Sequence, residues 1–349
     1  MKKIKCLIAI ALIISLVAGC SKKGEKEKNK YVEDFKYGVI VSGEQKDDAY
    51  IECLDEDLNS VGNYHIDYNI DGYGVGMPFV YDDKLYCRSR GYGGYEDDCN
   101  AIIFDYRTGT YETIHFDDCV ALTDIKADEN YIYGVSNLNW KNHIYRYSRK
   151  NKEMEEIIID GTDALYLYPC DGEVYVYVWE KNGKKVQALH RVDFENESLQ
   201  KIKKISKYSP QSFVNYDKKL YLPCDKEMVV YDPVNEEISK YSIPVKIAYS
   251  CCSHDNMIYV LDYDMRDCVK PSKLVAFDMN LNQVVNTYEL EPDVDSVCMN
   301  ENVILASDGM GTVYKYELNE QEGTLEKVAE HTVDYDDYFY PAICINTAK

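Results

Sequence analysis

A short strand pattern recurs along the chain from residue 31 onward. Each copy has a polar turn, then apolar residues, and in most copies a tyrosine. Six clear copies and a weaker first one lie at Asp83–Tyr86, Asn130–Tyr133, Gly172–Tyr175, Lys218–Tyr221, Asn256–Tyr259, Glu301–Ile304 and, first in the chain, Tyr37–Ile40. Their last residues are spaced by 46, 47, 42, 46, 38 and 45 positions, the length of one four-stranded propeller blade.

Further strand-like segments surround each copy. A second segment ends in an aspartate turn, as in Ile103–Asp105, and a third follows, as in Tyr111–Phe116. Another segment precedes each copy, such as Met77–Tyr81. Apolar and polar residues alternate between turn residues, which is typical of strands and hairpins. Residues 31–349 contain no sustained helical period, so an all-β fold is predicted.

The first copy has no strand of its own before it, and the C-terminal segment Tyr340–Ile345 offers the missing one. We therefore predict a seven-bladed β-propeller over residues 31–349, with the C-terminal strand closing the first blade. This closure leaves no open sheet edge at the seam of the ring. Six or eight blades stay open as alternatives, because one mis-assigned copy would change the number.

These segments resemble the β-propellers of the quinoprotein-dehydrogenase-like and YVTN type. The resemblance lies in the apolar-tyrosine strand and in the turn with an apolar residue, an aromatic residue and an aspartate, and it covers roughly residues 31–349. The chain has no strict WD40 signature and no tryptophan docking motif for a quinone cofactor. Propellers of this type include enzymes, binding proteins and scaffolds, so the resemblance implies a fold and leaves the function open.

The first thirty residues have a different character. A basic start precedes the apolar run Cys6–Val17, which is too short to span a bilayer and is typical of a secretory signal. The segment Leu16–Cys20 resembles the lipobox of bacterial lipoproteins, which implies cleavage before Cys20 and lipid on that cysteine. The alternative is an uncleaved anchor, or an ordinary signal with a chance cysteine.

Three parts of the chain follow from this. We expect a lipoprotein signal peptide at 1–19, a lipidated cysteine with a lysine-rich flexible tether at 20–30, and the propeller at 31–349. The tether has no apolar residue after Cys20, and its ten residues would reach about 33 Å at full extension. The protein is expected to be exported and anchored to the outer face of the cell membrane, or on the periplasmic or outer-membrane side in a host with two membranes.

The charge of the chain limits its partners. The net charge is −22, and leaving out the signal and the tether, at +3 each, gives −28 for the propeller. Such a surface repels phosphate backbones, so we expect no nucleic-acid partner. Cations and basic partners are compatible with it.

Thirteen cysteines are present, and eleven remain when Cys6 and Cys20 are set aside. An odd number does not suit a full disulfide framework, and many of them lie within apolar strands, where a thiol acts as a small hydrophobic group. We expect mostly unpaired, buried thiols, with Cys87 and Cys99 as the one pair to test. No cysteine and histidine have the spacing of zinc ligands.

Candidate binding residues lie in the loops of one propeller face. Loops after the second strand of a blade and loops between blades open on that face, and the longest we find are Arg88–Asn100 and Asp264–Ser272. Arginine and aromatic side chains there suit a glycan, another small molecule or a protein partner. The candidates are Arg88, Arg90, Tyr92, Tyr95, Trp140, Trp179 and Arg266. Mobile surface loops and packing between blades are the alternatives.

Calcium is a weak candidate ligand. Asp67, Asn69 and Asp71 match the first half of an EF-type loop, but Val75 and Pro78 stand where later ligands belong. A second acidic group comprises Asp262, Asp264 and Asp267. We expect no other metal or cofactor.

Catalytic motifs are not evident. There is no Gly-x-Ser-x-Gly elbow, and the six histidines are scattered over the predicted blades. We therefore expect a membrane-anchored binding or scaffold module. One alternative is an extracellular lyase, hydrolase or oxidoreductase with its site at the mouth of the propeller channel. Another is a sensor or accessory subunit near a transporter.

Overall fold

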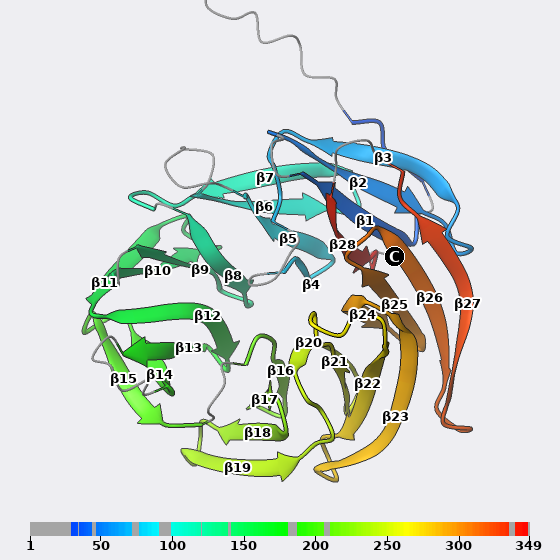
Figure 1. Cartoon of the computed structure of the whole chain (residues 1–349). Helices are drawn as coiled ribbons and strands as arrows, with labels where there is room; N and C mark the ends of the chain where they lie inside the picture. The colour runs from blue at the N-terminus through cyan, green and yellow to red at the C-terminus, as the bar shows by residue number, and fades with distance from the viewer. Residues whose placement is uncertain are drawn as a thin grey trace, which may run out of the picture. The chain divides into compact units, whose positions relative to one another are not determined.

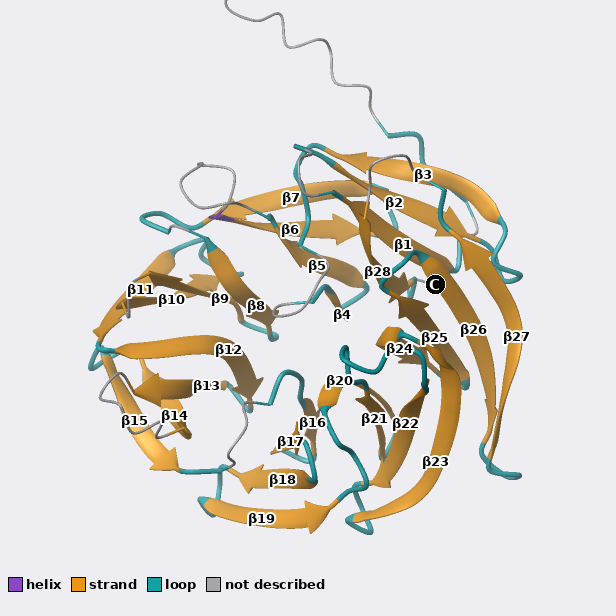
Figure 2. Ribbon diagram, in the orientation of Figure 1, coloured by secondary structure: helices purple, strands orange, loops and turns teal. Residues whose placement is uncertain are grey.

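The computed structural model describes residues 29–347 except 34, 44–46, 72–76, 91–98, 120, 139–140, 181–186, 206–209 and 335–338. The chain from Tyr31 onward forms one compact unit. Its strands make seven four-stranded antiparallel sheets around a central axis, which confirms the seven-bladed propeller (Figures 1 and 2). No helix in the described residues is long and apolar enough to cross a membrane.

The strands of each blade are given from the axis outward. Blade 1 comprises β28 (Phe339–Ile345), β1 (Tyr37–Ser42), β2 (Ala49–Leu54) and β3 (Ser60–Ile66). Blade 2 comprises β4 (Phe79–Tyr81), β5 (Lys84–Arg88), β6 (Asn100–Asp105) and β7 (Thr110–His115). Blade 3 comprises β8 (Leu122–Ala127), β9 (Tyr131–Leu138), β10 (Lys141–Ser148) and β11 (Met154–Asp160). Blade 4 comprises β12 (Thr162–Cys170), β13 (Glu173–Glu180), β14 (Gln187–Asp193) and β15 (Ser198–Lys203).

The remaining three blades repeat this order. Blade 5 comprises β16 (Val214–Tyr216), β17 (Lys219–Cys224), β18 (Glu227–Asp232) and β19 (Glu237–Ser242). Blade 6 comprises β20 (Ala248–His254), β21 (Met257–Asp262), β22 (Pro271–Asp278) and β23 (Gln283–Pro292). Blade 7 comprises β24 (Val294–Asn300), β25 (Val303–Asp308), β26 (Thr312–Asn319) and β27 (Thr324–Thr332).

Blade 1 joins the two ends of the propeller, as expected. The C-terminal β28 is its innermost strand and pairs antiparallel with β1, with Tyr37 opposite Ile345 and Gly38 opposite Cys344. Backbone bonds between Lys36 and its neighbours Leu54 and Asn346 continue this blade beyond the paired strands. The ring is thus closed by main-chain hydrogen bonds between segments from opposite ends of the fold.

The core lies between the blades. Seven apolar clusters each join two neighbouring blades, and all their buried members lie between Phe35 and Ile345. The propeller therefore contains its own hydrophobic core. The repeated tyrosines are buried within it: Tyr86, Tyr133, Tyr175, Tyr221 and Tyr259 are each at most 3% exposed.

The last copy of the repeat is shifted by one residue from the predicted alignment. Val303 pairs with Asn300 across the turn, as Lys84 pairs with Tyr81 in blade 2. Leu305, and not Ile304, therefore occupies the position of the buried tyrosine. A shift of one residue exchanges the two faces of a strand, so this correction also fixes which neighbouring residues face blade 1.

The aspartate turns of the sequence pattern have a local cause. The carboxylate of Asp105 accepts the backbone N–H of Arg107 at 2.8 Å, and that of Asp278 accepts the N–H of Asn280 at 2.8 Å. Such side-chain bonds to the backbone two residues on favour a turn. The apolar and aromatic residues before each aspartate complete the third strand of the blade.

The one cysteine pair that the sequence offered for testing, Cys87 with Cys99, forms no disulfide, since Cys87 is a thiol. Cys87 pairs with Ile102 across β5 and β6, so Cys99 lies three residues further along, about 10 Å away in a strand. A disulfide requires Cα atoms within about 7 Å. Cys53, Cys87, Cys170 and Cys344 are buried thiols, in agreement with the other part of the cysteine prediction.

Candidate functional site

The two faces of the propeller differ in their connections. On one face, here called the turn face, the innermost strand joins the second through tight turns such as 82–83, 171–172 and 217–218. On the other, the loop face, the connections include 67–78, 89–99, 204–213 and 263–270. The loop face therefore holds two long interblade connections, 67–78 and 204–213, in addition to the two long loops predicted from the sequence. A site built from varied loops belongs to the loop face.

The blade 2 candidate Arg88 is engaged inside the protein. Its side chain donates to the backbone carbonyl of Leu122 at 2.6 Å and pairs with the carboxylate of Asp71. Arg88 is 8% exposed. It therefore connects β5 to the segment before blade 2 and to the first strand of blade 3, which is a structural role.

The neighbouring candidates are placed only in part. Arg90 donates its backbone N–H to the carbonyl of Asn69, also at the edge of blade 2. Tyr92, Tyr95 and Trp140 lie outside the described residues, as does the side chain of Trp179. The backbone of Trp179 pairs with Gln187 in β13 and β14. Cys20 also lies outside the described residues.

The proposed calcium ligands do not converge on one point. The carboxylate of Asp67 accepts the Tyr111 hydroxyl at 2.9 Å, the amide of Asn69 donates to the Gly43 carbonyl at 2.7 Å, and Asp71 pairs with Arg88. No group of three metal-ligating side chains is found in the described part of the chain. These three residues instead hold the segment between blades 1 and 2 in place.

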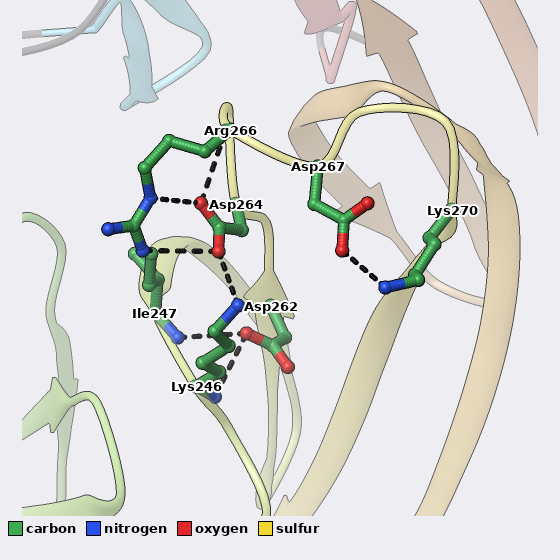
Figure 3. Close-up of polar contacts among 7 residues, drawn as sticks. All are labelled: Lys246, Ile247, Asp262, Asp264, Arg266, Asp267 and Lys270. Atoms are coloured by element: carbon green, nitrogen blue, oxygen red, sulfur yellow. Dashed lines mark hydrogen bonds and ion pairs between the residues drawn. The ribbon is translucent and has the colours of Figure 1, made fainter.

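The second acidic group fixes the loop between β21 and β22, as Figure 3 shows. Asp264 pairs with Lys246 and with the guanidinium of Arg266, at 2.8 Å from Oδ1 to Nε. One oxygen of Asp262 accepts the backbone N–H groups of Lys246 and Ile247, both at 2.9 Å. The side-chain bonds from Arg266 and Lys246 hold the pKa of Asp264 well below its usual value. The charges of the loop thus hold it in one conformation, and the guanidinium of Arg266 is bonded to Asp264 within the same loop.

A concave feature to which all seven blades contribute is the central channel. It has a volume of about 610 Å³ and is lined by residues from all seven innermost strands. Toward the loop face its wall includes Gln211, Ser212 and Phe213, and toward the turn face it includes Asp128 and Asp171. Cavities of about 300–1,000 Å³ are typical of small-molecule sites.

Five thiols contribute to the channel wall, and each packs in a different interface between blades. In order around the ring these are Cys170, Cys251, Cys252, Cys298 and Cys344, which lie between blades 4 and 5, 5 and 6, 6 and 7, 7 and 1, and 1 and 2. Burial raises the pKa of Cys170 and of Cys344 to about 11. These two thiols are therefore protonated at neutral pH, and they line the channel as small neutral groups.

A buried ion pair in blade 3 contributes the channel's lysine. Nζ of Lys126 lies 2.6 Å from Oδ1 of Asp124, whose other oxygen accepts the N–H of Leu167 in blade 4 at 2.9 Å. The ammonium also lies 5.1 Å from the ring centre of Phe79, a channel residue of blade 2. Three neighbouring blades are therefore joined at the channel wall by one lysine and one carboxylate.

A second carboxylate near the channel has a raised pKa. Asp295, next to the channel residue Ser296, lies where the pairing of β24 with β25 is shifted by a bulge. Burial, reinforced by the charges of Asp293 and Asp308, raises its pKa to about 7. Such a group is suited to proton transfer.

Sequence reasoning did not find Asp124, Lys126 or Asp295. All three lie on innermost strands, which were recognised as strands only by their place before each repeat. The available signal was a charged residue inside an otherwise apolar strand, since such residues are rarely buried without a partner.

No protein-family model and no curated protein sequence matches the chain. Among solved structures, the periplasmic gluconolactonase of Pseudomonas aeruginosa is similar with a TM-score of 0.61 and 12% identity, covering 89% of this chain and 99% of that one. A candidate 6-phosphogluconolactonase from Bacteroides fragilis has a TM-score of 0.60 and 10% identity, with 91% and 99% covered. Apo AztD from Citrobacter koseri has a TM-score of 0.55 and 10% identity, with 91% and 100% covered. At these identities the likeness shows a common β-propeller fold.

Proposed function

We propose that the protein is an exported lipoprotein whose propeller binds a small molecule in its central channel. The observation that supports this proposal is the channel itself, with a volume of about 610 Å³ and a wall from all seven blades. The wall combines aromatic side chains such as Phe79 and Phe213 with polar ones such as Gln211 and Ser250. This mixture is typical of a ligand site, in which apolar area gives affinity and a few polar groups give orientation.

The anchoring part of the proposal is supported by the sequence. Leu16–Cys20 resembles a lipobox, and the lysine-rich segment after it has the composition of a tether. A binding domain on such a tether would collect its ligand outside the cell and keep it at the membrane surface. The alternative role of a sensor or accessory subunit near a transporter would use the same binding step.

A second candidate function is hydrolysis of a lactone, for which one observation speaks. Asp295 lies beside the channel residue Ser296 with a pKa raised by burial to about 7, as a general base or acid needs. Two of the similar solved structures carry gluconolactonase names. Activity on glucono-δ-lactone that is lost in Asp295→Asn and kept in Asp255→Asn would establish this function.

The binding proposal is tested with the propeller domain, residues 31–349, and the neutral dye Nile red. Gln211 is an exposed residue at the channel wall, so Gln211→Trp should fill the channel without disturbing the core. Gln321→Trp adds the same ring to an exposed outer turn. We expect the fluorescence of Nile red to rise when the wild-type domain or the Gln321→Trp variant is added. With the Gln211→Trp variant the fluorescence should stay below that of the wild type. Equal fluorescence from both variants would reject the channel as the binding site.

A further inference from the structure

The charged groups of the channel wall leave an excess of negative charge. Lys126 is neutralised by Asp124, which is 1% exposed. The carboxylates Asp128, Glu129 and Asp171 also line the channel, at its turn-face end, and Lys218 lies 3.2 Å from Asp171. A cation near Asp128 and Glu129 is Arg149, which donates to the backbone carbonyl of Asp128 at 2.8 Å and pairs with the carboxylate of Asp82 at 3.5 Å. In the described part of the chain, the wall itself holds no lysine that would compensate the carboxylates of Asp128 and Glu129. No arginine is among the described residues that line the channel.

The tyrosine at the same end of the channel adds no charge to it. Burial is the main cause that raises the pKa of Tyr81; among the nearby charges Arg149 lowers it, and the carboxylates Asp128, Asp82 and Glu129 raise it. The phenol is therefore neutral at neutral pH. The thiols of Cys170 and Cys344 do not add to the negative charge of the wall, because burial raises their pKa and keeps them neutral.

Aromatic faces at the channel already hold cations of the protein. The ammonium of Lys126 lies 5.1 Å from the ring centre of Phe79, and the guanidinium of Arg149 lies 5.5 Å from that of Tyr81. Phe213 and Tyr249 are further aromatic residues of the wall. A ring face attracts a cation through its quadrupole, and more strongly where water is excluded.

We infer that the channel takes a small organic cation, an amine or quaternary ammonium compound with an apolar body. The apolar body would lie against the aromatic and sulfur-containing residues of the wall, including Met77 and Met299, whose sulfur atoms are polarisable. The charged end would lie toward Asp128 and Glu129. A phosphorylated or carboxylated ligand would meet carboxylates and no arginine, so anions are disfavoured. This inference rests on the channel being the ligand site proposed above.

Three probes of one shape test the sign of the charge: phenyltrimethylammonium, its uncharged counterpart tert-butylbenzene, and phenyl phosphate. We expect the cation to compete with Nile red about tenfold better than the neutral probe, and phenyl phosphate not to compete. Raising the salt concentration should weaken the binding of the cation alone among the probes, because salt screens exposed charges.

Matched variants locate the effect. Glu129→Gln removes one exposed charge from the turn-face mouth of the channel, and Tyr81→Leu removes an aromatic face at the same end while keeping an apolar side chain. Both variants should weaken the binding of the cation several-fold and leave the binding of tert-butylbenzene almost unchanged. Glu195→Gln and Phe194→Leu, in the outer turn of blade 4, are the controls and should leave both probes unchanged.

The outcomes separate the inference from the proposed function. If tert-butylbenzene or phenyl phosphate binds as well as the cation, and the Gln211→Trp variant still blocks it, the channel is a binding site and the cation inference is wrong. If Gln211→Trp lowers the binding of neither Nile red nor any of the three probes, the proposed channel site and the cation inference are both wrong. A preference for the cation that survives both Glu129→Gln and Tyr81→Leu would also overturn the inference.

Discussion

Gly38 and Cys344 face each other across the seam of the propeller, although 306 positions separate them in the sequence. The Cys344 thiol donates a weak hydrogen bond to the Gly38 carbonyl, with 3.6 Å between sulfur and oxygen. A Cβ atom added to Gly38 would lie 2.7 Å from that sulfur and 3.2 Å from Cγ2 of Ile51. Close contact between the two strands thus depends on the absence of a side chain at position 38.

The first prediction concerns this contact. Gly38→Ala should lower the free energy of unfolding of the propeller by about 1–3 kcal/mol, as overpacking of a core does. Cys344→Ala removes the opposing sulfur, so the double variant should be more stable than the sum of the two single effects implies. Urea unfolding followed by circular dichroism measures the three variants. Strict additivity would show that the sulfur is not what Gly38 accommodates.

The second prediction concerns pH. The pKa of Asp295 is about 7 in the folded protein and about 4 in an unfolded chain, so between these values the folded state holds a proton that the unfolded state lacks. The contribution of Asp295 to stability is therefore present at low pH and lost as the pH rises to about 7. Asp295→Asn should stabilise the protein above pH 7, by at most about 4 kcal/mol.

This gain should shrink as the pH falls from 7 toward 4, because wild-type Asp295 then becomes neutral as well. Thermal unfolding of wild type and variant across this range measures the difference. Asp255→Asn, at an exposed turn of blade 6, is the matched control. A difference between wild type and Asp295→Asn that does not change with pH would contradict the assignment of a raised pKa to Asp295.

The third prediction compares two arginines that the sequence offered as ligand-binding residues. Arg88→Met should cost about 3 kcal/mol, because it leaves the Asp71 carboxylate and the Leu122 carbonyl without their partner in a largely buried site. Arg266→Met should leave the stability nearly unchanged, since Arg266 is exposed on its loop. Urea unfolding of both variants decides, and equal effects would contradict the different roles assigned to them.

The fourth prediction concerns the membrane. Cys20→Ser should prevent lipidation, so the protein should appear in the soluble fraction of the exported proteins with its propeller folded. Fractionation with antibody detection, together with thermal unfolding of the soluble form, provides the measurement. A Cys20→Ser protein that stays membrane-bound after its signal is removed would argue against the lipid anchor.

The fold could be predicted from the sequence repeat, whereas the residues of the candidate site could not. Blade number and closure follow from turns that recur at nearly constant spacing. Each turn is fixed by local bonds, such as that from the backbone N–H of Arg107 to the carboxylate of Asp105. The shift of the last copy from Ile304 to Leu305 escaped detection, since neither residue is aromatic and both are apolar. Register, which depends on the partner strand, decides such cases.

The channel depends on contacts between blades that no single repeat encodes. Lys126 and Phe79 belong to neighbouring blades, and their contact follows from how the blades pack around the axis. The bond of Arg88, a candidate for the binding face, to Leu122 has the same origin, because Leu122 starts the next blade. Spacing in the sequence showed where each strand is and gave no information on these partners.

The pairing of Tyr37 with Ile345 has a consequence for the order of folding. During synthesis, the second to seventh blades can each collect all four strands from one continuous stretch of chain. The first blade must wait for β28, which follows all the other strands in the sequence, so its inner edge stays open while they emerge. The ring becomes complete only when β28 has been made, and until then β1 can pair wrongly with strands of other molecules.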